Sequence, residues 1–362
     1  MKKILVIGPI PEPTTGVSLA NQIVIDHLIA ENGFETSCIN TSFHKFDENL
    51  GSFSIAKLFF YLKLNFYSYK IFNVETVYIT PGQTFYGVLK YAFFIFITKL
   101  LGKELIAHIH GNHLRKEYLT LKGFKKRLFK VFLRQIDKGI VLSEMLVGNL
   151  SPFIVNEKIF IVYNFVQDYL FSEEELIQKK LELGKPKIIF LSNLMEEKGV
   201  FEVLEALKLL EKEGFNFQAK IAGNIDERHK DSIHKYFDSL KNLEYCGVVS
   251  GQEKKELLLW GTIFILPTYY AMEGQPISIL EAMATGNLIL TTKHAGIPDI
   301  FEDGVNGYFV EKQNIKSIVA KIKFATFDKS NSDAMRLQNY SIAKREYTVE
   351  NFIKNIERIF RN

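Results

Sequence analysis

Short apolar runs alternate with amphipathic stretches along the chain, and this alternation constrains the fold more than any other feature. In the first half the apolar runs lie at residues 3–8, 35–40, 76–80, 104–109, 139–142 and 159–163, with helical patterns such as 18–30 between them. Parallel strands need long crossover connections, which are usually helices. The alternation therefore predicts an α/β fold with a parallel sheet covered on both faces.

A second series of the same kind follows the charged stretch 168–186, whose Gly-Lys-Pro ending is typical of a hinge. Its apolar runs lie at 187–192, 217–222, 243–246, 262–266 and 287–291, and 199–213 has a helical pattern. A chain of 362 residues with 47% hydrophobic content can bury two cores. We therefore expect two doubly wound, Rossmann-like domains, residues 1–166 and 167–345. They should face each other across a cleft at the carboxyl ends of their strands, where such sheets bind ligands.

Two carboxylates eight positions apart, Glu273 and Glu281, flank a Gly and a Pro after the run 262–266. Pro276 suits a first helical turn, because its missing N–H is one that the helix could not use. Such a helix leaves Glu273 in the preceding loop and Glu281 about a turn and a half inside. The backbone N–H groups between the two acids then form a seat for a phosphate. The residues expected to line this seat are Gly274, Gln275, Pro276 and Ile277. With an acid on each side to bind hydroxyls, it matches the layout of a sugar nucleotide. The alternative is that the carboxylates only cap the helix.

The run 273–284, Glu-x7-Glu followed by Ala-Met-Ala, resembles the donor-site signature of the family 4 glycosyltransferases (glycosyl transferases group 1). This is the retaining, nucleotide-sugar-dependent family with the GT-B fold. The resemblance implies that the N-terminal domain binds the acceptor and the C-terminal domain the donor. It also implies that a last helix, about 346–362, packs back on the first domain. Glu273 would bind the 3- and 4-hydroxyls of the sugar, as a catalytic residue, and Glu281 the ribose.

The segment 192–199 resembles the Gly-Arg-Leu-x-x-x-Lys-Gly loop of the family. The resemblance implies that Lys198 is catalytic and donates to the leaving diphosphate. Asn193, also in the donor site, stands where the family generally has Arg. Asn gives a neutral hydrogen bond, whereas Arg gives a charged, two-pronged contact to phosphate. The loss of one charged contact costs about 1.5–3 kcal/mol.

His110 lies in the segment 107–113, which contains three histidines. Zinc would need a further ligand and an open geometry, and neither is apparent, so we expect no metal site. The His110-Gly111 step resembles a His-Gly step of the family, which implies that His110 reaches the transferred sugar as a catalytic residue. His108 is expected to lie in the core or behind His110.

Three further turns carry weaker matches. Gly16 lets the backbone approach a ligand closely, and Ser18 can cap the helix that follows. The family usually has two adjacent glycines here, whereas this chain has only Gly16. The resemblance implies that Gly223 and Asn224 approach the diphosphate and that Val248 lies near the base. It also implies a mostly structural role for the turns of 296–307.

Composition excludes several other classes. Two cysteines far apart indicate neither a disulfide framework nor a metal site, so we expect a reducing cytoplasm. The apolar start is broken by prolines too early for a signal peptide. A net charge of +4 does not call for nucleic acid as a partner, and no stacking motif accompanies the basic residues.

The basic stretch from Arg115 to Lys138 interleaves Lys and Arg with Leu, Phe and Val. This is the pattern of a basic amphipathic helix, which predicts peripheral contact with an anionic membrane. The alternative is a solvated helix whose apolar side packs on its own domain. The aromatic stretches 54–72 and 83–101 are interpreted as domain helices, and no transmembrane segment is predicted.

The resemblance implies retaining, metal-independent transfer of a sugar from a UDP- or GDP-linked donor, with no cofactor. The expected acceptor is a lipid-linked glycan in the synthesis of a bacterial capsule, O-antigen or exopolysaccharide, at the inner face of the plasma membrane. Two alternatives remain open. One is a non-catalytic scaffold partner with the GT-B fold, and the other is a sugar-nucleotide epimerase of the same fold.

Overall fold

The computed structural model describes residues 1–43, 55–181 and 184–362, with side chains of the second range described from residue 59. The start of the predicted aromatic stretch 54–72 lies outside the described residues. Contacts divide the chain into two compact units, Met1–Tyr163 with Phe352–Asn362, and Asn164–Asn351. The predicted domain boundaries, after 166 and at about 346, stay a prediction.

The first unit is built on a six-stranded parallel sheet with the order β2-β1-β3-β4-β5-β6. Its strands are β1 (Lys2–Gly8), β2 (Phe34–Asn40), β3 (Thr76–Ile79), β4 (Glu104–Ile109), β5 (Lys138–Val141) and β6 (Ile159–Ile161). Each begins and ends within two residues of its predicted bounds. Residues Ile4 to Ile7 of β1 are completely buried, because helices cover both faces of the sheet.

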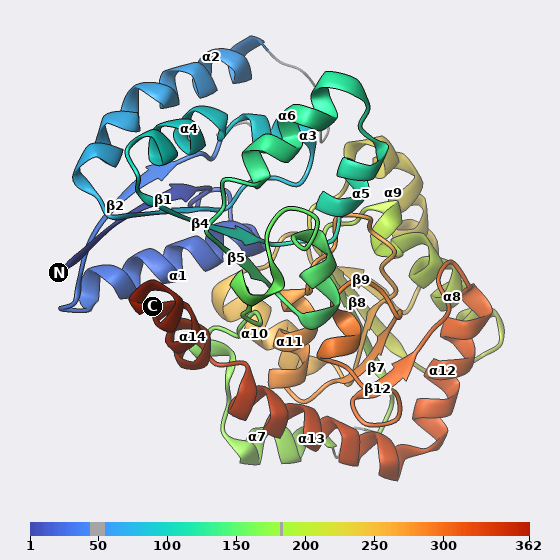
Figure 1. Cartoon of the computed structure of the whole chain (residues 1–362). Coiled ribbons are helices and arrows are strands. Elements are labelled where there is room, and N and C mark those ends of the chain that lie inside the picture. The colour runs from blue at the N-terminus through green and yellow to red at the C-terminus, as the bar shows by residue number, and fades with distance from the viewer. Residues whose placement is uncertain (44–54, 182–183) are drawn as a thin grey trace. The chain divides into compact units, whose positions relative to one another are not determined.

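Right-handed crossovers place the helices of the first unit on opposite faces of its sheet (Figure 1). Helix α1 (Gly16–Ala30) and the last helix, α14 (Val349–Arg361), lie on one face. The other face carries α2 (Ile55–Leu64), α3 (Phe85–Leu89), α4 (Ala92–Leu100) and α6 (Gly123–Leu133). The remaining helical turns are η1 (Asn65–Asn73), α5 (Leu114–Thr120), η2 (Glu144–Asn149) and η3 (Asn156–Lys158). Helix α14 is held on the first sheet, since Lys2 Nζ donates to Phe360 O at 2.6 Å.

The start of α1 corrects one prediction. Thr15, not Ser18, is the N-cap residue: its side chain accepts a hydrogen bond from Ser18 N at 3.1 Å. Ser18 is the third residue of the helix, and its hydroxyl accepts from Thr15 N at 2.7 Å. The two residues form a capping box, in which each side chain satisfies the other's backbone N–H.

The second unit contains another six-stranded parallel sheet, with the order β12-β11-β10-β7-β8-β9. Its strands are β7 (Lys187–Leu191), β8 (Gln218–Ala222), β9 (Leu243–Tyr245), β10 (Ile263–Leu266), β11 (Leu288–Thr291) and β12 (Gly307–Phe309). The chain winds outward from β7 to β9, returns to the other side of β7, and winds outward again from β10 to β12. The order therefore reverses between β7 and β10, and such a reversal is where open α/β sheets bind ligands.

Helices also cover both faces of the second sheet (Figure 1). Helices α8 (Val200–Lys212) and α12 (Ile315–Phe327) pack against each other, and α9 is Lys230–Ser239. Four other helices form a second packed group: α7 (Glu174–Leu181), α10 (Gly251–Trp260), α11 (Ile277–Ala284) and α13 (Lys329–Glu346). Single turns lie at η4 (Asp168–Leu170), η5 (Glu196–Lys198), η6 (Glu227–His229) and η7 (Ile297–Asp299). Within the described ranges, no helix is long and apolar enough to cross a membrane.

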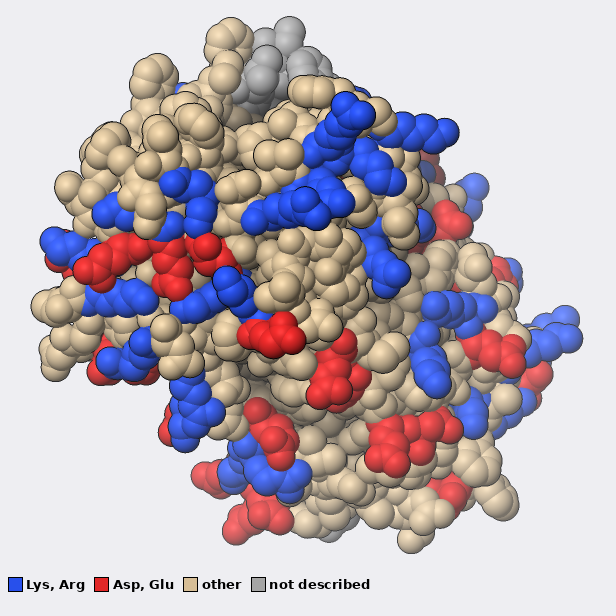
Figure 2. Space-filling view, in the orientation of Figure 1, with Lys and Arg blue, Asp and Glu red and all other residues tan. Residues whose placement is uncertain are grey.

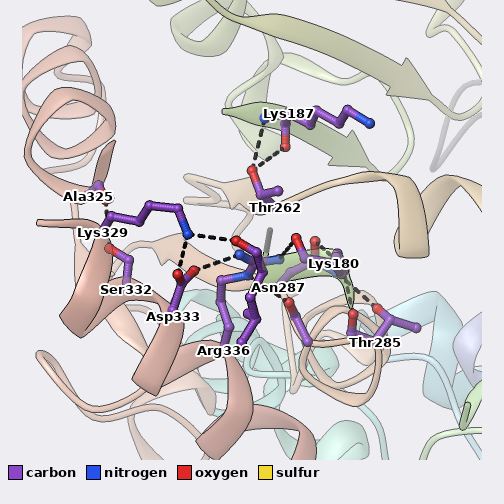
Figure 3. A network of polar contacts seen from close by, with 12 residues as sticks. Lys180, Lys187, Thr262, Thr285, Asn287, Ala325, Lys329, Ser332, Asp333 and Arg336 are labelled. Atoms are coloured by element: carbon purple, nitrogen blue, oxygen red, sulfur yellow. Dashed lines mark hydrogen bonds and ion pairs between the residues drawn. The ribbon is translucent and has the colours of Figure 1, made fainter. Parts of the chain in front are cut away.

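A buried lysine ties α7 to the core of the second unit (Figure 3). The Lys180 ammonium donates to Leu258 O at 2.8 Å, to Thr285 O at 2.7 Å and to Asn287 Oδ1 at 3.0 Å. Burial lowers its pKa well below the ordinary value, and the charge of Arg336 adds to the shift. Three donors meet three acceptors here, so the cost of burying the amine is offset by hydrogen bonds.

We expect Lys180→Met to lower the free energy of unfolding by about 3 kcal/mol, because it leaves buried acceptors without their donor. Urea denaturation followed by circular dichroism measures the change. Lys179→Met is the matched control, since Lys179 is the exposed neighbour in the same helix. Equal stability of the two variants would contradict this account.

Candidate active site

The loops that follow β7 and β10 are bound to each other at the reversal of strand order. The Glu197 carbonyl accepts from Tyr269 N at 2.8 Å and from Thr268 Oγ1 at 3.3 Å. Gly199 has φ +83°, and a Cβ there would lie 2.5 Å from Pro267 Cγ, so the close approach requires glycine. These contacts hold Lys198 of the first loop over the second.

Lys198 and Glu273, both predicted as catalytic residues, are in direct contact. Lys198 Nζ lies 2.6 Å from Glu273 Oε2, and the same oxygen accepts from Thr268 Oγ1 at 3.1 Å. The ammonium also lies 5.1 Å from the centroid of the Tyr270 ring. Glu273 is buried, with 7% of its surface exposed, so the pair is strengthened by a low local dielectric. Sequence reasoning did not single out Thr268.

Helix α11 begins one residue later than predicted. Pro276 is its N-cap, with φ −64° and ψ 115°, and Ile277 is the first helical residue. The extended ψ of Pro276 is typical of a cap residue, which lies outside the helix. Glu281 is the fifth residue of α11, and Glu273 lies in the preceding loop as predicted. The first N–H groups of α11 have no acceptor inside the helix, as at any helix start.

The phosphate-seat residues Gly274 and Gln275 are anchored by neighbouring segments. Gly274 O accepts from Gly296 N at 2.9 Å, so the predicted turn at 296–307 does support this loop. Asn164 N donates to Gln275 Oε1 at 2.6 Å, and Asn164 Nδ2 donates to Gln275 O at 2.8 Å. The backbone of the seat is therefore held in place from two sides.

Glu281 is paired with a lysine that sequence reasoning missed. Lys254 Nζ of α10 lies 2.6 Å from Glu281 Oε1. A signal for Lys254 was present: it lies three and four positions before Leu257 and Leu258, the buried residues of the same helix. Residues at this spacing share a helix face, so a lysine here points toward the core and needs a partner.

The other predicted donor-site residues lie in the loops after β7, β8 and β9. The Asn193 side chain is exposed. Asn224 O accepts from Leu194 N at 2.8 Å, which joins the loops after β7 and β8. A Cβ on Gly223 would lie 1.8 Å from Ser192 O, so its absence of a side chain serves chain packing. Val248 is 68% exposed.

Gly16 and His110 belong to the first unit. Gly16 is exposed and begins α1. The rings of His108 and His110 lie 3.9 Å apart between centroids, and His108 Nδ1 lies 2.7 Å from the Tyr78 hydroxyl. The His110 side chain is half-buried, but its Nε2 atom is shielded from solvent and has no hydrogen-bond partner among the described residues. Burial lowers the pKa of His110 to about 3, so the ring is neutral at physiological pH.

Within the part of the chain that the structure describes, no group of three or more His, Cys, Asp or Glu side chains could hold a metal ion. Cys38 and Cys246 are free thiols. The predicted independence from metals stays a prediction.

Comparison with known proteins gives the context for this site. Residues 172–343 match the family described as Glycosyl transferases group 1. WcaL of Salmonella typhimurium, which its name proposes to be a colanic acid biosynthesis glycosyltransferase, is 28% identical over 230 residues, which are 62% of this chain and 55% of the relative. The N,N'-diacetylbacillosaminyl-diphospho-undecaprenol alpha-1,3-N-acetylgalactosaminyltransferase of Campylobacter jejuni is 28% identical over 209 residues, 55% of this chain and 52% of the relative. The chain thus spans about half the length of these curated relatives.

A solved structure shows the same fold. Alr3699/HepE of Anabaena, in complex with UDP-glucose, aligns with a TM-score of 0.73 over 100% of both chains, at 14% identity. At this identity the likeness shows the fold alone. The family match, the curated relatives and the two six-stranded parallel sheets agree with one another. Residues 172–343 are therefore similar to the glycosyl transferases group 1 family, and the fold of the chain is GT-B.

Proposed function

We propose that this chain is a retaining glycosyltransferase that moves a sugar from a nucleoside diphosphate sugar to an acceptor hydroxyl. The observation that carries the proposal is the contact between Lys198 and Glu273, 2.6 Å apart at the reversal of strand order. A cation, an acid that can bind hydroxyls and a helix N-terminus meet there, and a sugar diphosphate needs all three.

The donor diphosphate takes the place of Glu273 as the partner of Lys198. In the structure, Glu273 neutralises the Lys198 ammonium. When a diphosphate binds, Lys198 and the first N–H groups of α11 donate hydrogen bonds to the phosphate oxygens. Glu273 is then free to accept hydrogen bonds from the sugar hydroxyls. The first N–H groups of a helix and a nearby cation are the donors that stabilise a leaving diphosphate.

Transfer needs no protein base under this proposal. The bond between the anomeric carbon and the diphosphate oxygen breaks, and the bond to the acceptor oxygen forms on the same face of the sugar. The proton of the acceptor hydroxyl passes to the leaving diphosphate, so retention follows without a covalent intermediate. No step requires a metal ion. His110, a neutral ring, binds a sugar hydroxyl.

The acceptor and donor classes rest on the relatives. The name of WcaL refers to colanic acid biosynthesis, and the name of the Campylobacter relative refers to a diphospho-undecaprenol acceptor. HepE was solved with UDP-glucose. We infer that this chain extends a lipid-linked glycan in the synthesis of a bacterial surface polysaccharide, with a UDP- or GDP-linked donor.

We also infer peripheral contact with an anionic membrane through α6 and its neighbours. Figure 2 shows Lys and Arg side chains gathered over the region that α5 and α6 occupy in Figure 1. Exposed basic residues here are Arg115, Lys116, Lys122, Lys125, Arg127 and Arg134. Among them Phe124 is 76% exposed and Val131 53% exposed. Exposed cations beside exposed apolar side chains suit a lipid surface that is anionic outside and apolar within.

We expect Lys198→Met and Glu273→Gln to lower the turnover of sugar transfer by about 100- to 1000-fold, because each removes a group that contacts the reacting substrate. Release of nucleoside diphosphate from a panel of UDP- and GDP-sugars measures the rate. Lys208→Met is the control, since its exposed side chain lies on the neighbouring helix α8. An undiminished rate in Lys198→Met would overturn the assignment of the site.

We expect Asn193→Arg to lower the dissociation constant of UDP or GDP by about tenfold, because it restores a charged contact to phosphate. Isothermal titration calorimetry measures the constant, and Asn193→Gln, which adds length without charge, should leave it unchanged. If Arg weakens binding or has no effect, position 193 does not face the diphosphate.

We expect the protein to float with vesicles that contain phosphatidylglycerol, and to be released at about 1 M salt, where charges are screened beyond about 3 Å. Reversal of Lys122, Lys125 and Arg127 to Glu should weaken binding at least tenfold, since each basic residue contributes about 1 kcal/mol. The same reversal at Lys235, Lys241 and Lys316, exposed in the second unit, is the control. Absence of binding at low salt would contradict the inference.

A further inference from the structure

Glu281 is a buried carboxylate with an unequal pair of oxygens. Only 4% of the residue's surface is exposed. Oε1 is paired with Lys254 Nζ at 2.6 Å. Oε2 makes no hydrogen bond with the residues that the structure describes. One oxygen is thus held by the protein, while the other is available to a ligand.

The Lys254 ammonium contacts Glu281 and is largely shielded from solvent. Its side chain is 17% exposed. Burial alone would lower its pKa, but the charge and the hydrogen bond of Glu281 raise the pKa above its ordinary value. Tyr169 is a second neighbour of the ammonium, and it also raises the pKa of Lys254. The lysine is therefore charged at physiological pH.

The neighbouring lysine behaves differently, which makes it a useful comparison. Lys255 is half-buried, and its ammonium donates to the main-chain oxygens of Tyr169 and Phe171, at 2.7 Å and 3.2 Å. It fastens the segment of η4 to α10 without touching Glu281. The two adjacent lysines of α10 therefore have different partners. Lys255 binds main-chain oxygens of the segment at η4, and Lys254 binds the Glu281 carboxylate.

We propose that Lys254 is a positioning residue of the donor site: it fixes the Glu281 carboxylate through Oε1 so that Oε2 accepts hydrogen bonds from the hydroxyls of the donor ribose. This inference rests on the proposed function, because it takes the ligand to be a nucleoside diphosphate sugar. Neither the family match nor the sequence motifs single out Lys254.

The chemistry explains why a lysine is needed. An ionised carboxylate only accepts hydrogen bonds, whereas a protonated one also donates. Lys254 holds Glu281 through Oε1 and restrains the rotation of the carboxylate, so Oε2 presents an acceptor where the 2′- and 3′-hydroxyls present donors. Without Lys254, the site should no longer prefer a ribonucleotide over a 2′-deoxyribonucleotide.

The test compares ribose with deoxyribose. Dissociation constants are measured by calorimetry for UDP, 2′-deoxy-UDP, GDP and 2′-deoxy-GDP, with the full chain and with Lys254→Met, Lys254→Gln, Lys254→Arg and Lys255→Met. We expect the full chain to prefer the ribonucleotide by about tenfold or more, since a hydrogen bond to a charged group contributes about 1.5–3 kcal/mol. Lys254→Met and Lys254→Gln should reduce this preference to less than threefold, and Lys254→Arg and Lys255→Met should keep it.

Each result separates one account from another. Equal weakening of UDP and 2′-deoxy-UDP in Lys254→Met would mean that the lysine binds phosphate, and would overturn the positioning role. An unchanged preference in both neutral variants would also overturn it. If the full chain binds neither UDP nor GDP, the proposed function fails, and this inference fails with it. Thermal unfolding of each variant shows whether a loss of binding reflects a loss of fold, and the milder Lys254→Gln keeps a polar group if Lys254→Met unfolds.

Discussion

The main-chain carbonyl of Glu197 accepts hydrogen bonds from Tyr269 N and Thr268 Oγ1, and these bonds join the loop after β7 to the loop after β10. The two loops leave neighbouring strands at the one place where the strand order of the second sheet reverses. Lys198 follows Glu197 in the first loop, and Glu273 follows in the second, so their 2.6 Å contact depends on this attachment. Gly199 permits it, since a side chain there would collide with Pro267.

The second unit contains two largely buried lysine–glutamate pairs that involve donor-site candidates: Lys198 with Glu273, and Lys254 with Glu281. A buried charge without a partner is costly, and each pair offsets that cost. Under the proposals above, the phosphates of a donor replace Glu273 as the partner of Lys198. The ribose hydroxyls donate to Glu281 while it stays paired with Lys254. The same charges that pair with each other in the structure are therefore the groups proposed to recognise the donor.

Much of the fold was predictable from the sequence, because a strand buried on both faces reads as a continuous apolar run. The strands of both sheets lie within two residues of their predictions, but β12 was not predicted, since its three residues include Gly307 and carry too short a pattern. Lys198 and Glu273 were singled out through loop motifs, and the structure brings them into contact. Lys254 was missed because its partner is 27 positions away and only the shared burial of α10 and α11 brings them together. Ser18 was taken for the N-cap because Ser and Thr are both favoured cap residues, whereas the structure has Thr15 at the cap and Ser18 at the third helical position.

A crystal structure of the chain with bound UDP or GDP tests the central claim most directly. The account predicts that a phosphate oxygen lies within hydrogen-bond distance of Lys198 Nζ, that the ion pair with Glu273 has opened, and that the ribose lies beside Glu281 with Lys254 still in place. A nucleotide bound elsewhere, or one bound while Lys198 and Glu273 remain in contact, would contradict it.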